Sequence, residues 1–139
     1  MSKDIEVTVA EVVDYLRITG RFMPALRAVV ERNIAATTAR KSGVKVSAGE
    51  LQRAADVFRI SHDLAKAKDM KAWLRTNGLS QEAFENHLET NLRISKLKDR
   101  LLAKANMKKY SASPVIRSSI RELAYQDWLD SALRSALKK

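Results

Sequence analysis

The chain contains no cysteine, which excludes disulfide bonds, thiolate zinc sites, cysteine nucleophiles and thiol redox chemistry. Its two histidines, His62 and His87, lie far apart in the sequence and lack the spacing of metal ligands. No uncharged stretch approaches the ~20 apolar residues that cross a bilayer. Residues 1–6 carry acids where a signal peptide would be basic and then apolar. We therefore expect a cytoplasmic protein with no metal site and no membrane contact.

Glycine and proline are also scarce, with 4 and 2 residues in a chain of 139. This scarcity favours helices over a β fold rich in turns. The length suits one domain spanning residues 1–139. Lys and Arg total 26 against 16 for Asp and Glu, a formal net charge of +10. Because 45% of the residues are hydrophobic, the chain has the material for a core and is not a disordered basic tail.

Three segments have the pattern of a helix start. Thr8, Ser47 and Ser80 are capping residues, each with an apolar residue just before it and another four residues after it, as in a hydrophobic staple. Glu11 and Glu50 stand three residues after the first two caps and complete capping boxes, whereas the third start lacks this acid. The sequence therefore predicts helices that begin just after each cap.

Helix ends are indicated by Gly20, Gly43 and Gly78, each of which follows a periodic stretch where a left-handed residue is favoured. The short alternations at 5–7 and 44–46 are interpreted as extended entries to helices rather than strands. The expected helices span residues 9–19, 23–41, 48–62, 70–77, 81–108 and 114–137. These signals predict an all-α fold of about six helices in one compact domain.

Apolar spacing predicts which helix faces form the core. The second helix is expected to bury Leu26, Val29, Val30 and Ile34, and the third to present Leu51, Ala54, Ala55, Phe58 and His62 on one side. The helix at 81–108 would be about 42 Å long at ~1.5 Å per residue and is expected to be a spine for the others. The last helix is apolar over more than half its circumference, so other helices or a partner must enclose it.

The long helix carries a basic stripe, which we define as Arg93, Lys96, Arg100, Lys104 and Lys108. Their spacing places them on one helix face. Such a row could follow a phosphate backbone, attract an acidic polypeptide, or simply face solvent. No aromatic residue interleaves these cations, which favours the solvated face over nucleic acid.

The aromatic residues allow two interpretations. Trp73 lies with Met70 and Leu74 on a helix too short to be stable without docking its apolar side. These three residues are more typical of a core, although a short apolar helix also suits the wall of a binding site. No nucleophile motif or phosphate loop is present, and the carboxylate pairs have helix-surface spacing. The sequence therefore predicts a protein that is not an enzyme and needs no cofactor.

The order of these motifs resembles the N-terminal helical domain of SurA-like chaperones, a family that includes parvulin-type prolyl isomerases. The resemblance covers residues 5–103. It depends on residues 8–16, on VKVSAGEL at 44–51, which leads into the third helix, and on GLSQEAFE at 78–85, which opens the long helix.

In that family an isomerase domain follows the long helix, and a C-terminal helix then returns to the N-terminal ones. Here residues 105–113 form only a short connector between the helical region 5–104 and a returning helix at 114–137, so the isomerase domain is missing. The resemblance implies a module that binds polypeptide without isomerase activity. It also implies a helper of secreted or modified peptides.

The leading hypothesis from the sequence is a non-catalytic, chaperone-like module that binds extended, partly apolar polypeptide between its helices. Its candidate wall residues are Tyr15, Phe22, Met23, Met70, Trp73, Leu74 and Trp128. A homodimer through the C-terminal helix, exchanged about the hinge at 105–113, is a further possibility. The alternative function is nucleic-acid binding through residues 93–109.

Overall fold

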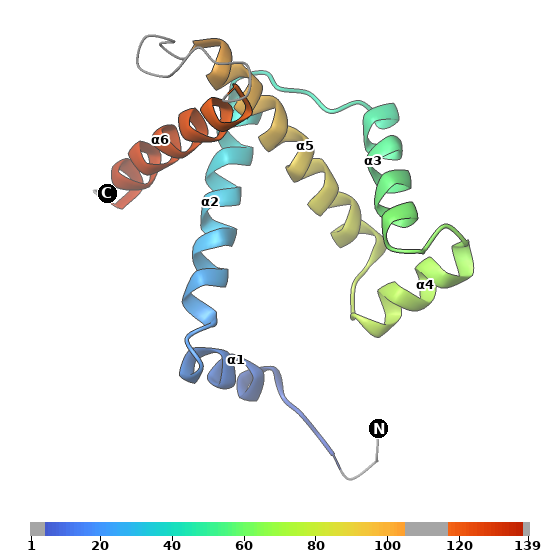
Figure 1. Ribbon diagram of the computed structural model, residues 1–139. Helices are drawn as coiled ribbons and strands as arrows, with labels where there is room; N and C mark the ends of the chain where they lie inside the picture. Colours follow the sequence, from blue (N-terminus) through green and yellow to red (C-terminus); the bar gives the residue numbers. More distant parts are fainter. Residues whose placement is uncertain (1–4, 105–116, 138–139) are drawn as a thin grey trace.

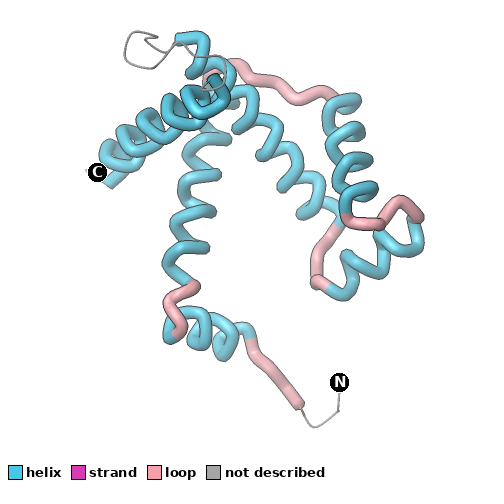
Figure 2. The backbone as a smooth tube through the Cα atoms, viewed as in Figure 1, coloured by secondary structure: helices cyan, strands magenta, loops and turns pink. Residues whose placement is uncertain are grey.

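The computed structural model describes residues 5–104 and 117–137, and every regular element in these ranges is a helix (Figure 1). Figure 2 shows loops, but no strands, between these helices. The helices are α1 (Val9–Ile18), α2 (Phe22–Lys41), α3 (Ala48–Ser61), α4 (Ala67–Thr76), α5 (Gln81–Lys104) and α6 (Arg117–Leu137). The predicted all-α fold is confirmed. The fourth helix begins at Ala67, three residues before the expected start, and the connector 105–113 lies outside the described residues.

The predicted helix starts are confirmed in detail. The backbone amide of Glu11 donates to the Thr8 hydroxyl at 3.1 Å, which caps α1. At α3 the capping box is complete, because Ser47 accepts from the Glu50 amide while its own amide donates to the Glu50 carboxylate. The Ser80 hydroxyl accepts from the third amide after it, at 3.0 Å, at the start of α5. Local hydrogen bonding therefore fixes where these helices begin.

The first four helices end in the same hydrogen-bonded turn. Gly20, Gly43 and Gly78 have φ between +63° and +78°, as expected. The residue after each glycine donates to a carbonyl five residues back, as in the bond from Val44 to Ala39 at 2.9 Å. The end of α3 makes the same turn with Asp63, a non-glycine residue at φ +56°. These turns set the direction in which the chain leaves each helix.

Two apolar clusters lie along α5, which confirms its predicted role as the spine. The first joins α5 to α3 and α4 and contains the buried residues Ala55, Leu64, Met70, Leu74, Phe84 and Leu88. The second joins α5 to α2 and to residues of α6, and its buried members are Ala35, Ala39, Val44, Ile94 and Leu97. Ile120 and Leu129 of α6 are each only 1% exposed, so other helices of the same chain cover much of this helix.

The helices α2 and α5 run in the same direction and meet at their C-terminal ends. Arg32 contacts α5 at His87 and Asn91, and Ser42, just beyond α2, contacts Arg100. Towards their N-terminal ends the two helices diverge (Figure 1). The molecule therefore has two arms, one made of α1 and the first half of α2, the other of α3, α4 and the first half of α5.

The prediction for the buried face of α2 is wrong for Leu26, Val29 and Val30, whereas Ile34 is half-buried. Leu26, Val29 and Val30 are 43%, 54% and 41% exposed, whereas the buried residues of this helix are Ala35, Ala36 and Ala39. Only the C-terminal half of α2 packs against α5 and α6, and small side chains there allow the backbones to approach closely. The first half of α2 projects from the packed helices together with α1, which buries none of its residues.

Candidate functional site

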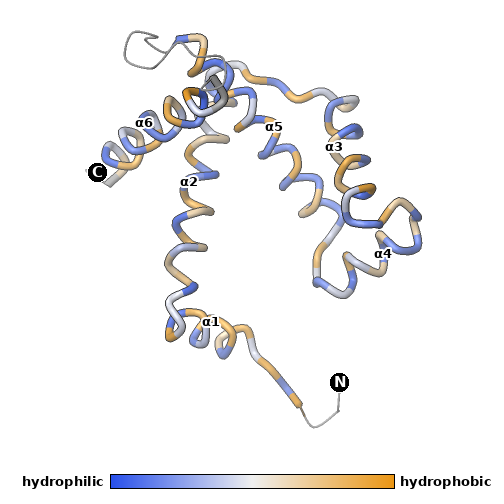
Figure 3. Tube along the Cα trace, viewed as in Figure 1, coloured by the Kyte–Doolittle hydropathy of each residue, from blue (hydrophilic) through white to orange (hydrophobic). Residues whose placement is uncertain are grey.

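The arm formed by α1 and the first half of α2 exposes an unusual amount of apolar surface. Figure 3 shows hydrophobic residues recurring along α1 and the chain before it. The large apolar residues that are between 41% and 86% exposed on this arm and on the segment before it are Ile5, Val7, Val9, Val12, Tyr15, Ile18, Met23, Leu26, Val29 and Val30. Single exposed apolar residues are ordinary, but a run of this length on one segment is typical of an interaction surface.

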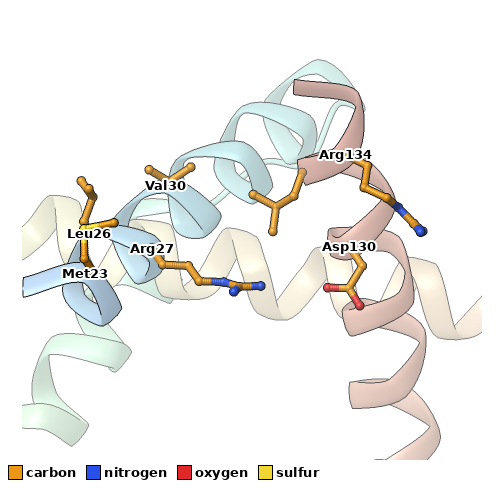
Figure 4. Close-up of a pocket in the computed structure, with 7 residues that line it drawn as sticks. Met23, Leu26, Arg27, Val30, Asp130 and Arg134 are labelled. Atoms are coloured by element: carbon orange, nitrogen blue, oxygen red, sulfur yellow. The ribbon is translucent and has the colours of Figure 1, made fainter. Parts of the chain in front are cut away.

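A groove of about 710 Å³ separates the first half of α2 from the end of α6. Figure 4 shows α2 on one side of this groove and α6 on the other. We call it the α2–α6 groove, and it is lined by Met23, Leu26, Arg27, Val30, Asp130, Leu133 and Arg134. Its walls are mainly apolar and its border is charged, an arrangement typical of sites that hold an apolar group in a fixed orientation.

The charged border is partly held in place by an ion pair. The Arg27 Nε donates to Glu31 at 2.9 Å, one helical turn further along α2. This hydrogen bond, reinforced by the charge of Glu31, raises the pKa of Arg27 above its usual value. Figure 4 shows the Arg27 side chain extending from α2 towards the helix that carries Asp130. The border therefore carries Arg27 and Arg134 together with two carboxylates, those of Glu31 and Asp130.

A second groove of about 550 Å³ lies further along α2 and shares Val30 with the first. Its lining is richer in hydroxyl and amide groups, which come from Asn33, Thr37, Thr38 and Ser135. These groups can both donate and accept hydrogen bonds. The same face of α2 therefore offers apolar contacts at one end and hydrogen-bonding side chains at the other.

The corner between α1 and α2 gathers two of the predicted wall residues. The Arg17 guanidinium lies 4.6 Å from the ring centroid of Phe22, and Arg21 donates to the Tyr15 hydroxyl at 3.3 Å. Met23, a third predicted wall residue, lines the α2–α6 groove one residue further on. The structure thus brings these three residues, Tyr15, Phe22 and Met23, to one arm.

The other predicted wall residues lie elsewhere. Met70 and Leu74 are 4% and 8% exposed in the first cluster, so they belong to the core rather than to an open wall. Trp73 is half-buried there, with its ring centroid 5.4 Å from that of Phe58 in an edge arrangement. Trp128 is half-buried against the second cluster. These four residues do not share a surface with the α1–α2 arm.

The basic stripe is largely used to hold the fold together. Arg93 and Lys96 donate to the carbonyl oxygens of Val44 and Lys45, at 2.7 and 2.6 Å, and Arg100 donates to the carbonyl of Ser42. We call these three contacts the loop clamp, because all of them fasten the loop after α2 onto α5. Such side chains do not form a free row of cations for phosphate. Lys104 is exposed, and Lys108 lies outside the described residues.

The clamp also strengthens the start of α3. The Lys96 ammonium donates to the Glu50 carboxylate at 2.9 Å. This bond, together with those from the amide and hydroxyl of Ser47, lowers the pKa of Glu50 from 4.5 to about 2. The capping box and the clamp are therefore one connected network.

A further contact joins the middle of α2 to the first half of α5. Arg32 of α2 donates to the Asn91 side chain at 2.6 Å and lies 3.3 Å from Nδ1 of His87. A guanidinium can only donate, so Nδ1 accepts and the proton of the neutral ring is on Nε2. Burial, and then the charge of Arg32, lower the pKa of His87. His87 is thus an exposed side chain held against α2 by Arg32.

Sequence reasoning missed Leu26, Val30 and Leu133, the main apolar residues of the α2–α6 groove. Leu26 and Val30 were expected in the core because their spacing is that of a buried helix face. The available signal was the group of small residues Ala35, Ala36 and Ala39 in the second half of α2, where helix backbones can approach closely. Spacing alone does not tell which end of a helix is covered.

Among the described residues, no helix has both the length and the apolar character needed to cross a membrane. In the same ranges, no three His, Asp or Glu side chains gather as metal ligands would. Comparisons with protein-family models, with curated proteins and with solved structures find no match to this chain.

Proposed function

We propose that this chain is a non-catalytic polypeptide-binding module and that the α2–α6 groove receives apolar side chains of an extended client. The observation that carries this proposal is the apolar lining of the groove, provided by the exposed residues Met23, Leu26 and Val30 and the half-buried Leu133. Its volume of about 710 Å³ is within the range of about 300–1,000 Å³ typical of ligand sites.

The second groove offers hydrogen-bond partners for an extended backbone. A polypeptide without secondary structure carries unpaired amides and carbonyls, which need hydrogen-bond partners when they leave water. Asn33, Thr37, Thr38 and Ser135 line this second groove and offer such partners. Apolar side chains of the client would enter the α2–α6 groove while its backbone pairs with these groups.

The charges of the molecule favour an acidic client. The border of the groove contains Arg27 and Arg134 as well as the carboxylates of Glu31 and Asp130, and the whole chain carries a formal net charge of +10. Long-range attraction of this kind raises the rate at which an oppositely charged partner arrives. The resemblance of residues 5–103 to SurA-like chaperones points to the same class of client, an unfolded or extended polypeptide.

A single-cysteine label tests this proposal directly. The chain has no cysteine, so Leu26→Cys can be labelled at one position with an environment-sensitive fluorophore. Titration with reduced, carboxymethylated α-lactalbumin, a permanently unfolded acidic protein, is expected to give a saturable blue shift. The matched control is Val57→Cys on α3, which is 66% exposed outside the groove and is expected not to respond.

A second substitution checks that the groove itself is responsible. Leu133→Asp, introduced beside the label at position 26, places a charge in the apolar lining and is expected to weaken binding at least about tenfold. A response that is absent at position 26, or equal at positions 26 and 57, would refute the proposal.

A further inference from the structure

The helix α1 has ten residues and buries none of them. Isolated helices shorter than about 12–15 residues are marginal in water, and most helices in proteins are stabilised by packing one apolar face. Val9, Val12 and Tyr15 follow each other at three-residue spacing and are 81%, 46% and 57% exposed. We call these three residues the α1 stripe. A helix of this length needs a surface that covers such a stripe.

The exposed area is that of an interface. Summed over all faces, the ten exposed apolar residues of the α1–α2 arm and of the segment before it present on the order of 1,000 Å² of apolar surface. A stable protein interface buries about 800 Å² on each partner. The arm is therefore large enough to be one side of a dimer.

We propose that α1 of one copy docks into the α2–α6 groove of a second copy, and that the second copy does the same in return. Each chain carries both the stripe and the groove, so two copies related by a two-fold axis satisfy both surfaces and close the assembly. The stripe supplies apolar side chains, and Met23, Leu26 and Leu133 supply the apolar walls that receive them.

Charge supports this pairing. Residues 5–18 contain Glu6, Glu11 and Asp14 against one arginine, so the segment is acidic in a strongly basic chain. The groove that would receive it is bordered by Arg27 and Arg134 beside Asp130, and Arg27 is paired with Glu31. An acidic segment is attracted to a chain with net charge +10, whereas most other contacts between two copies of such a chain are repelled.

The geometry of the corner favours docking between chains over folding back within one chain. Gly20 at φ +73° and the bond from the Arg21 amide to the Leu16 carbonyl, 2.7 Å, set the angle between α1 and α2. The contacts of Arg17 with Phe22 and of Arg21 with Tyr15 hold the same angle. A fold-back would break these contacts, while a second copy covers the stripe without disturbing them.

Sedimentation over a range of concentrations tests the dimer. The wild-type chain is expected to show a reversible monomer–dimer equilibrium, and the double variant Val9→Ser/Val12→Ser is expected to raise its dissociation constant at least about tenfold. The matched control is Val57→Ser/Ile60→Ser, which replaces two exposed residues of α3, 66% and 72% exposed, and is expected to leave the constant unchanged. Arg134→Glu is expected to weaken the dimer as well.

Cross-linking between two differently marked proteins tests the arrangement. One protein carries Val12→Cys and the other Leu133→Cys, and a short bis-maleimide is expected to join them into a mixed dimer. Because each protein has one cysteine, this product forms only between chains. A wild-type chain that stays monomeric, a dimer unaffected by Val9→Ser/Val12→Ser, or the absence of the mixed product would each overturn the proposal.

Dimer formation and client binding can be measured separately. The variant Val9→Ser/Val12→Ser keeps every residue of the groove, so it should bind unfolded α-lactalbumin at least as well as the wild type, as measured with the label at position 26. Loss of the dimer with retained client binding supports both proposals. A dimer without client binding supports only this one.

Discussion

At the scale of single residues, the loop clamp explains why Arg93, Lys96 and Arg100 share one helix face. Each donates to a backbone carbonyl of the loop after α2. These loop carbonyls are not paired within a helix or a strand, and the long cationic side chains supply the donors that they lack. Three residues of the basic stripe therefore hold the loop between α2 and α3 against α5.

We expect Arg93→Ala to lower the free energy of unfolding by about 2 kcal/mol, because the change leaves the Val44 carbonyl without its charged donor. Arg93 is suited to this test since only 15% of its side chain is exposed. Lys104→Ala, at the exposed end of the same helix, is the control and should change stability by less than about 0.5 kcal/mol. Urea denaturation measures both, and equal effects would contradict the clamp.

The lowered pKa of Glu50 makes stability depend on acid. Its folded value of about 2 lies below its ordinary value of 4.5, so the ionised form stabilises the fold. This contribution is complete above about pH 4.5 and is lost as the pH falls through about 2. Glu50→Gln should flatten the decrease in thermal stability between these two pH values.

Glu82→Gln provides the comparison for Glu50, because Glu82 also lies in the first turn of a helix but makes no contact with the clamp. Thermal melts are measured between about pH 2 and pH 5 in steps of about half a unit. The stability of this variant should follow the wild-type curve. If Glu50→Gln followed that curve as well, the network would not contribute to acid stability.

At the scale of helices, much of the structure is predictable because its causes are local. The caps at Thr8, Ser47 and Ser80 and the glycines at the helix ends act within one turn of chain. The buried face of α2 was not predictable, because it depends on where α5 and α6 cross. The alanines that form it carry little hydrophobic signal. The groove was missed for the same reason.

The turns that end α2 and α3 allow a test in which two substitutions are expected to change stability in opposite directions. Asp63 occupies a left-handed conformation, φ +56°, in which the other three turns have glycine. Asp63→Gly should therefore raise the free energy of unfolding by up to about 1 kcal/mol. Gly43→Ala should lower it by about 1 kcal/mol through backbone strain, since nothing lies within 4 Å of the added carbon.

Denaturant titrations of these two variants give the answer. The prediction concerns the sign of each change, so it does not depend on the absolute stability of the protein. A destabilised Asp63→Gly would mean that the aspartate side chain contributes more than its backbone conformation costs.

At the scale of the molecule, the two apolar clusters form separate units along one spine, and each contains one tryptophan. Trp73 packs against the first cluster and Trp128 against the second. The clusters share α5 but none of their side chains. Regions of this kind can unfold at different free energies.

We expect Phe84→Ala to destabilise the first cluster by about 3–5 kcal/mol, because Phe84 is 4% exposed and contacts both Phe58 and Trp73. Measured by Trp73 fluorescence in a Trp128→Phe background, unfolding should shift to much lower urea. Measured by Trp128 in a Trp73→Phe background, the shift should be clearly smaller. Identical shifts would show that the protein unfolds as one unit.

The shared direction of α2 and α5 has an electrostatic consequence. Each helix carries partial negative charge at its C-terminal end, equivalent to about half an elementary charge, and parallel helices bring these ends together. Arg40 and Lys41 end α2, and Lys104 ends α5, while Arg100 donates to the carbonyl of Ser42 between them. Part of the net positive charge of the chain therefore offsets the partial negative charges at the C-terminal ends of α2 and α5. These cationic side chains are balanced within the molecule and need no bound anion.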